Sequence, residues 1–265
     1  MDINNKVVVV TGASFGIGRA VAQAASLAGA KVALVARSVG ELTDLAGKLG
    51  KDAAAFPGDM TKKADVERVM SEIDARFGRV DVLVNNAGRA ITGRIEELHV
   101  EYLHQVMELN VFGVLYGMQA AIPRMRQHGG GLIVNMSSGV SKLPHPIHGY
   151  GGYVASKCAV NALSEYARAE LAAENIRVMT VYPGIVATNF RTNALVSNDK
   201  WRLPIPTGIT PASPDYVAQR MVHAMREEPA ELRLDAGRKR PRLGNLSSVL
   251  SGLRRAIRMD GTAAR

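Results

Sequence analysis

Cysteine is almost absent from this chain of 265 residues, in which Cys158 is the only one. No intrachain disulfide can form, which fits a reducing, cytoplasmic compartment. Long apolar runs are missing as well, since no stretch approaches the roughly 20 apolar residues that cross a bilayer. Residues 1–6 lack the basic and then apolar pattern of a secretory signal. We therefore expect a cytoplasmic protein without a membrane span.

Motifs for a metal centre are also missing. The six histidines do not form H-E-x-x-H or a comparable ligand spacing, so we expect no metal site. The composition, 47% hydrophobic and 22% charged, is close to that of an average globular protein and excludes a disordered chain. The length allows one large α/β domain or two small ones.

Positive charge is concentrated near the C-terminal end. The net charge is +9, of which residues 237–265 carry +7, so the main body at 1–236 is nearly neutral and we expect no nucleic-acid partner. We interpret 237–265 as a basic C-terminal extension. Its apolar residues recur at helical spacing beside arginines, which indicates either a helix in weak contact with an anionic membrane surface or one packed on the body or another subunit. Nucleic-acid binding by the extension rests on charge alone.

Short apolar runs alternate with longer helical patterns along the main body. Runs typical of strands lie at residues 7–10, 31–36, 80–84, 132–136 and 177–182. Helical patterns lie at 16–27, 61–77 and 153–174, the second capped by Thr61. This rhythm predicts one α/β domain, a Rossmann-type doubly wound parallel sheet with helices on both faces. The proline-rich stretch 189–214 is predicted to be a lid over a substrate.

A glycine-rich turn joins the first predicted strand to the first predicted helix. Its sequence is Thr11-Gly12-Ala13-Ser14-Phe15-Gly16-Ile17-Gly18. Glycines let the backbone turn tightly and approach a pyrophosphate, and a helix N-terminus offers free N–H groups. The alternative is an ordinary turn. If the turn binds phosphate, its contacts are Gly12, Ser14, Gly16, Ile17 and Gly18.

The end of the second predicted strand favours NADP over NAD. Dinucleotide sites for NAD place an acidic residue here to bind a ribose hydroxyl. This chain has Ala36 followed by Arg37, whose guanidinium can form paired hydrogen bonds with a 2′-phosphate. The alternative is an arginine that only contacts solvent.

Several further motifs follow in a fixed order. They are Asp59, Asn85-Asn86-Ala87-Gly88, Asn110, Ser138, Tyr153-x-x-x-Lys157 and Pro183-Gly184. With the glycine-rich turn, they make residues 5–190 resemble the short-chain dehydrogenase/reductase family. The resemblance implies a nicotinamide cofactor, no metal, and hydride transfer between an alcohol and a carbonyl group. It also implies a homodimer or homotetramer, formed through the helices near Asn110 and Tyr153.

The catalytic residues are predicted to be Asn110, Ser138, Tyr153 and Lys157. Tyr153 and Lys157 are four residues apart on a helix and share a face. An adjacent ammonium lowers the pKa of a phenol, so Tyr153 is expected to act as general acid or base. Ser137 and Ser138 both end a strand, and the resemblance favours Ser138 as donor to the substrate oxygen. The resemblance also implies that Asn110 bends its helix and holds a proton-relay water, and that Lys157 holds the nicotinamide ribose.

The remaining cofactor contacts follow from the resemblance alone. It implies adenine contacts at Asp59 and Met60, adenosine-ribose contacts at Asn86, Ala87 and Gly88, and nicotinamide contacts at Pro183, Gly184, Ile185 and Thr188. The segment from Ser138 to Tyr153 is longer than the family pattern, which bears on the shape of the pocket.

The leading hypothesis is an NADP(H)-dependent oxidoreductase acting on a small carbonyl or alcohol substrate. Apolar residues in the predicted lid suggest that this substrate is apolar: Leu195, Val196, Trp201 and Ile205. Alternatively, these side chains pack inward. The alternative is a dinucleotide-binding sensor or scaffold protein with little turnover.

Overall fold

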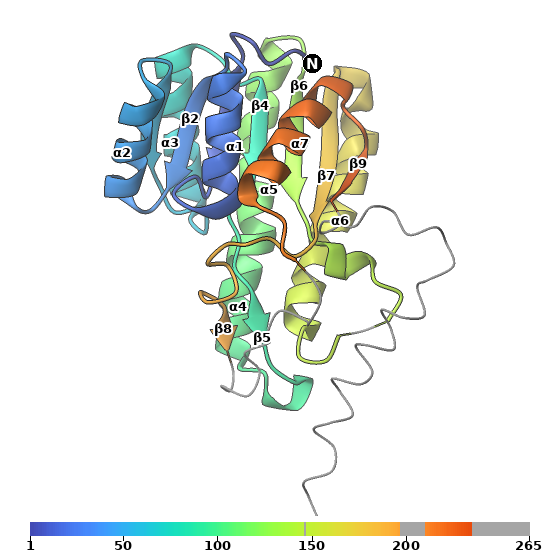
Figure 1. Cartoon of the computed structure of the whole chain (residues 1–265). Coiled ribbons are helices and arrows are strands. Elements are labelled where there is room, and N and C mark those ends of the chain that lie inside the picture. Colours follow the sequence, from blue (N-terminus) through green and yellow to red (C-terminus); the bar gives the residue numbers. More distant parts are fainter. Residues whose placement is uncertain (146, 197–209, 235–265) are drawn as a thin grey trace, which may run out of the picture.

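A parallel sheet of seven strands forms the centre of the computed structural model, which describes residues 1–145, 147–196 and 210–234. The strand order is β3-β2-β1-β4-β6-β7-β9 (Figure 1). The strands are β1 Val7–Thr11, β2 Lys31–Ala36, β3 Ala53–Pro57, β4 Val82–Asn85, β6 Gly131–Met136, β7 Ile176–Pro183 and β9 Glu231–Leu234. The order reverses direction between β1 and β4, as in doubly wound folds. Trp201, Ile205 and the basic extension lie outside the described residues.

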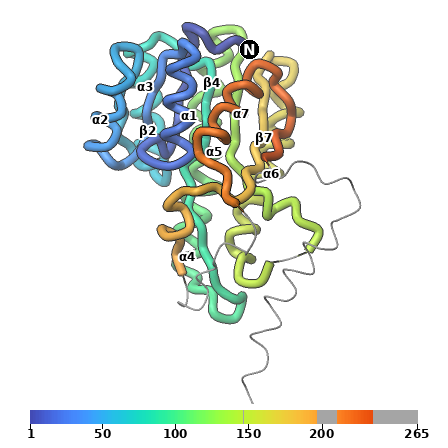
Figure 2. Tube along the Cα trace, in the orientation of Figure 1, coloured from blue at the N-terminus to red at the C-terminus, as the bar shows by residue number. Residues whose placement is uncertain are grey.

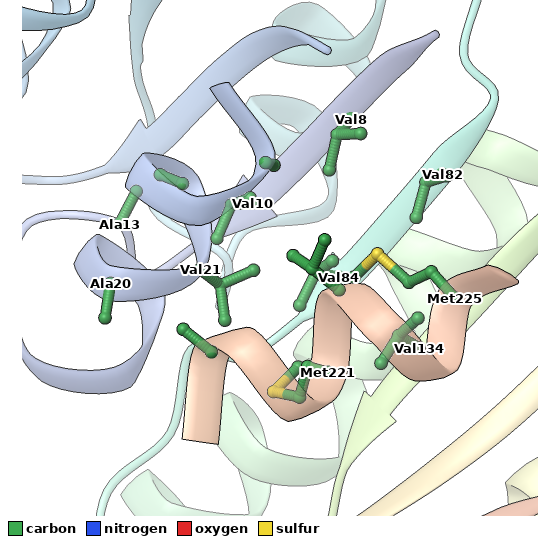
Figure 3. Packing of buried hydrophobic residues seen from close by; sticks show 14 of the residues in the cluster. Val8, Val10, Ala13, Ala20, Val21, Val82, Val84, Val134, Met221 and Met225 are labelled. Atoms are coloured by element: carbon green, nitrogen blue, oxygen red, sulfur yellow. The ribbon is translucent and has the colours of Figure 1, made fainter. Parts of the chain in front are cut away.

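Helices cover both faces of this sheet, which confirms the predicted fold class. They are α1 Gly16–Leu27, α2 Val39–Leu49, α3 Lys63–Phe77, α5 Gly113–Gln127, α6 Gly151–Leu171 and α7 Pro214–Glu227. Successive strand residues point to opposite faces, so Val8 and Val10 pack in one core and Val7 and Val9 in another. Figure 3 shows the first core, where side chains of α1 and α7 meet those of β1 and β4. Burial on both faces explains why these strands are continuous apolar runs.

The structure corrects the predicted start of one helix. The helix predicted at 61–77 begins at Lys63, and Thr61 does not cap it. Instead, the backbone N and the hydroxyl of Thr61 both donate to Asp59 Oδ1, at 3.0 and 2.9 Å. The carboxylate of Asp59 therefore closes a local turn before α3 begins.

An irregular turn separates α5 from the helix before it, α4 (Val100–Met107). Residues Glu108–Phe112 form a π-helical turn that contains Asn110. The Asn110 side chain is buried; its Oδ1 accepts from Arg89 N at 2.8 Å, and its Nδ2 donates to Ser156 Oγ at 3.0 Å. Such bulges inside helices occur frequently at functional sites. Asn110 thus lies at the helix irregularity that the resemblance implied.

A smaller subregion lies beyond the carboxyl ends of the central strands. It contains α4 and a two-stranded sheet of β5 (Ile91–Thr92) with β8 (Leu195–Val196) (Figures 1 and 2). Ligands of doubly wound proteins bind at this edge of the sheet. None of the helices among the described residues is long and apolar enough to span a membrane.

Candidate active site

The glycine-rich turn follows β1 and is tightly packed at its glycines. Gly12 and Gly16 have φ values of +66° and +56°, a region that favours glycine. A Cβ on Gly18 would lie 2.3 Å from the Gly12 carbonyl oxygen. A residue directly after the neighbouring strand β4 also fixes the turn, because Asn86 Nδ2 donates to the Thr11 carbonyl oxygen at 2.9 Å. The tight packing therefore requires glycine at these positions.

The end of α1 that points at this turn suits an anion. The helix begins at Gly16, and its N-cap residue Phe15 makes no side-chain capping hydrogen bond. The first N–H groups of a helix lack partners within the helix, and its N-terminus carries partial positive charge. Ser14 is buried and Ile17 half-buried beside this end. The turn and helix together fit the pyrophosphate of a dinucleotide.

We expect a Gly18→Ala substitution to lower the free energy of unfolding by about 2 to 3 kcal/mol, the cost of an overpacked site. The added methyl group would collide with the Gly12 carbonyl oxygen, which cannot move without distorting the turn. Urea unfolding at 25 °C measures the effect. The matched control is Gly40→Ala in α2, where nothing lies within 4 Å and alanine improves helix propensity. Equal unfolding free energies for the two variants would contradict the predicted collision.

Three predicted contacts for the adenosine half of the cofactor lie just after β2 and β3. Gly58 N donates to the Ala36 carbonyl oxygen at 3.0 Å, which places the residues after each strand side by side. Arg37 is exposed, and within the described part of the chain its side chain makes no hydrogen bond or ion pair. Asp59 has one carboxylate oxygen engaged by Thr61, and Met60 is buried. The guanidinium of Arg37 is thus available to a ligand at this edge.

The Asn86-Ala87-Gly88 segment links the cofactor turn to the catalytic residues. Thr11 Oγ1 accepts from the backbone N of both Asn86 and Ala87, each at 3.0 Å. A Cβ on Gly88 would lie 3.6 Å from the Lys157 Nζ. The side-chain nitrogen of Asn86, a residue expected to line the adenosine ribose, donates to the carbonyl oxygens of Thr11 and Gly12, a structural role that the motif alone does not reveal.

Three predicted catalytic residues meet where α6 passes the end of β6. Tyr153 and Lys157 lie one turn apart on α6 and are 6% and 4% exposed. Lys157 Nζ lies 5.8 Å from the centre of the Tyr153 ring and donates to the Met136 carbonyl oxygen at 2.8 Å. The Ser138 side chain is near enough to influence the pKa of Tyr153.

The two adjacent serines have different partners. Ser137 is buried, and its Oγ donates to Asn161 Oδ1 at 2.6 Å. It also lies 3.2 Å from Ser141 Oγ, so its hydroxyl joins β6 to neighbouring structure. Ser138 is half-buried and is the serine whose side chain influences the pKa of Tyr153. The geometry therefore favours Ser138 over Ser137 as the donor to a substrate oxygen.

Burial dominates the ionisation of the catalytic pair. It raises the pKa of Tyr153 above its ordinary value of 10.0, while the hydrogen bond with Ser138 acts in the lowering direction. Burial also lowers the pKa of Lys157 from 10.5 to about 8. The expectation that Lys157 lowers the pKa of Tyr153 is therefore wrong for the protein by itself, because desolvation of the phenol outweighs the effect of its neighbours.

The end of β7 and the segment that follows it lie beside the glycine-rich turn. They hold the predicted nicotinamide contacts Pro183, Gly184, Ile185 and Thr188. The methyl carbon of Thr188 lies 3.1 Å from where a Cβ on Gly16 would stand. The carbonyl oxygen of Ile185 accepts from Ala212 N at 2.9 Å, which fixes the start of the segment.

Sequence reasoning missed two aromatic neighbours of Tyr153. The ring centre of Phe190 lies 5.8 Å from that of Tyr153, and the ring centre of Tyr150 lies 6.4 Å from it. Tyr150 has no catalytic signal in the sequence, because its i+4 residue is Val154 rather than lysine. The one sequence signal for Phe190 is its position two residues after Thr188.

Comparisons with known proteins identify related oxidoreductases. The profile of a family described as short chain dehydrogenase matches residues 6–198. An uncharacterised oxidoreductase of Staphylococcus saprophyticus is 34% identical over 230 residues, which cover 85% of this chain and 92% of that protein. A short-chain dehydrogenase from Streptomyces avermitilis is 34% identical, covers all of both chains and superposes with a TM-score of 0.81.

A further solved structure shows a related protein with a nicotinamide dinucleotide. An alcohol dehydrogenase from the archaeon Thermococcus sibiricus, complexed with 5-hydroxy-NADP, is 33% identical, with a TM-score of 0.77 over 89% of this chain and 99% of that one. The family match spans the glycine-rich turn, Ser138, Tyr153 and Lys157. The chain therefore belongs to the short-chain dehydrogenase/reductase family and is an oxidoreductase.

Proposed function

We propose that the protein is an NADP(H)-dependent oxidoreductase that interconverts a small carbonyl compound and its alcohol. The observation that carries this proposal is the meeting of Tyr153 with Ser138 and Lys157 at the carboxyl edge of the sheet. A positioned acid, a hydroxyl donor and a cation at one point are the groups that carbonyl reduction needs. A sensor or scaffold with little turnover would not require them.

The chain offers a continuous set of residues to hold the cofactor. We assign the pyrophosphate to the glycine-rich turn, the adenosine to Arg37, Asp59, Met60 and Asn86-Ala87-Gly88, and the nicotinamide half to Tyr153, Lys157 and the segment from Pro183 to Thr188. The free N–H groups of α1 support the first assignment. A bound nicotinamide dinucleotide supplies or accepts the hydride.

The protein's own side chains carry out the proton transfer to or from the substrate oxygen. In reduction, the Tyr153 hydroxyl donates its proton to the substrate oxygen as negative charge develops there. Ser138 donates a hydrogen bond to the same oxygen and stabilises that charge. The raised pKa of Tyr153 keeps the phenol protonated at neutral pH, which favours its role as an acid. Asn110 positions this machinery through its hydrogen bond to Ser156 on α6.

We expect Arg37 to determine the choice between NADP and NAD. Charge-assisted hydrogen bonds to a 2′-phosphate contribute about 1.5 to 3 kcal/mol, so Arg37→Glu should lower kcat/KM for NADPH about 10- to 100-fold. The kcat/KM of the same variant for NADH should stay the same or increase, because a carboxylate binds the ribose hydroxyl of NADH. Initial rates with a panel of ketones, followed by nicotinamide absorbance with each cofactor, test both the reaction and the preference.

The control for this change is Arg220→Glu, the same charge reversal at an exposed position of α7. It should leave the ratio of the two cofactors unchanged. A wild-type preference for NADH, or an Arg37 variant that keeps the NADPH preference, would contradict the assigned role.

We also propose that the protein forms a homodimer or homotetramer through α5 and α6. Aromatic exposure supports this interface: Phe112 is 41% exposed and stacks on Tyr116, with ring centres 6.4 Å apart. Contact between the basic extension and a membrane surface stays a prediction, since residues 235–265 lie outside the described chain.

A further inference from the structure

Tyr153 belongs to an apolar cluster that is distinct from the two cores flanking the sheet. Ala90, Ile91 and Val106 are its other buried members. Partly buried apolar and aromatic side chains complete it, including Tyr150, Phe190 and Leu195. The phenol that we assign as the proton donor therefore lies in apolar surroundings, which do not stabilise a charged substituent on a substrate.

Backbone hydrogen bonds hold together the three loops that supply this cluster. Leu195 N donates to the Ala90 carbonyl oxygen at 2.9 Å, so the segment after β7 pairs with the segment after β4. Gly93 N donates to the Gly149 carbonyl oxygen, also at 2.9 Å, which ties in the loop before α6. These hydrogen bonds fix the loops relative to one another, so their side chains form a defined surface around Tyr153.

Two aromatic rings flank the ring of Tyr153 from different loops. The Phe190 ring is inclined at 60° to it and the Tyr150 ring at 63°, with centre distances of 5.8 and 6.4 Å. Both side chains are half-buried and keep accessible surface, whereas Tyr153 is almost fully covered. The two rings are therefore close enough to Tyr153 to contact a group attached to a carbonyl carbon that reaches its hydroxyl.

We propose that Phe190 and Tyr150 form a binding site for an aromatic ring next to the reacting carbonyl, so that the preferred substrates are aryl ketones and the corresponding alcohols. This inference rests on the proposed function. Aromatic rings at these separations and inclinations gain interaction energy in addition to that from burying apolar surface. A saturated ring gains only the energy from burial. Phe190 and Tyr150 are then specificity-determining residues of the proposed reaction.

Two ketones of matched size test this substrate class with the full-length protein. Acetophenone carries a flat aromatic ring, and cyclohexyl methyl ketone carries a saturated ring on the same carbonyl group. We expect kcat/KM of the unsubstituted protein to be about 5- to 10-fold higher for acetophenone, the range of one aromatic pair. Phe190→Leu should reduce this ratio to within about twofold, and Phe190→Tyr should retain it, because only leucine removes the aromatic ring.

Tyr216→Leu is the matched control, since this aromatic side chain is 41% exposed on α7, and the ratio should not change. Equal use of the two ketones by the unsubstituted protein would overturn the inference, as would a Phe190→Leu variant that changes both kcat/KM values by the same factor. In either result the protein still reduces ketones, so the proposed function stands. Failure to reduce any ketone with either cofactor would overturn the proposed function and the inference with it.

Discussion

Replacing Tyr153 with phenylalanine should lower kcat for ketone reduction by about 10²- to 10⁴-fold, the range that a positioned general acid contributes. The substitution removes only the hydroxyl and keeps the ring that packs against Phe190 and Tyr150. The protein should therefore fold, and its affinity for NADPH should change by less than about threefold, because most cofactor contacts are elsewhere. Steady-state rates and a separate cofactor titration measure the two effects.

Tyr166→Phe is a control that makes the same chemical change on the same helix. Tyr166 is 70% exposed on α6, away from the catalytic pair, and its loss of a hydroxyl should not change kcat. If Tyr153→Phe reduces ketones as fast as the unsubstituted protein, the hydroxyl is not the proton donor. The sensor or scaffold hypothesis would then account better for the preserved site.

Strong local patterns explain which elements were predictable. The residues of α1 and β2 match their predicted ranges, because each has a clear apolar pattern bounded by a turn. The β3 strand contains three alanines, a residue with high helix propensity, and it is a strand because Ala54 pairs with Ala33 of β2. That pairing is a tertiary contact, which local sequence does not encode.

The site residues that could be predicted from the sequence are likewise those with a local pattern, and those that could not depend on the folded chain. Residue identity and i+4 spacing were sufficient to predict the Tyr153–Lys157 pair on one helix face. Of the two aromatic neighbours, Tyr150 is close to Tyr153 in sequence, but Phe190 comes from a distant loop, and only the folded chain brings it to Tyr153. Burial also has no sequence signature at a single residue, which is why the direction of the pKa shift of Tyr153 was predicted wrongly.

The buried ammonium of Lys157 should lower the free energy of unfolding of the protein, although the proposed reaction needs it. Its pKa is lowered from 10.5 to about 8, so burial disfavours the charged form by about 3 kcal/mol at pH 7. Lys157→Met removes this cost and leaves the Met136 carbonyl without its side-chain donor, a loss of about 1 kcal/mol. We therefore expect the variant, measured without cofactor, to be about 2 kcal/mol more stable at pH 7 and at least about 100-fold less active.

The sign of this effect can be tested by its pH dependence. Between pH 8 and 10.5 the unfolded chain binds more protons at Lys157 than the folded chain does, so the stability of the unsubstituted protein rises with pH in this window. The advantage of Lys157→Met should accordingly be full below about pH 8 and disappear toward pH 10.5, as urea unfolding at pH 7 and pH 10 can measure. The control is Lys63→Met, since that side chain is 62% exposed, and its effect should stay within about 0.5 kcal/mol at both pH values. A Lys157→Met variant that is less stable at pH 7 would mean that the surroundings of the ammonium stabilise its charge instead of opposing it.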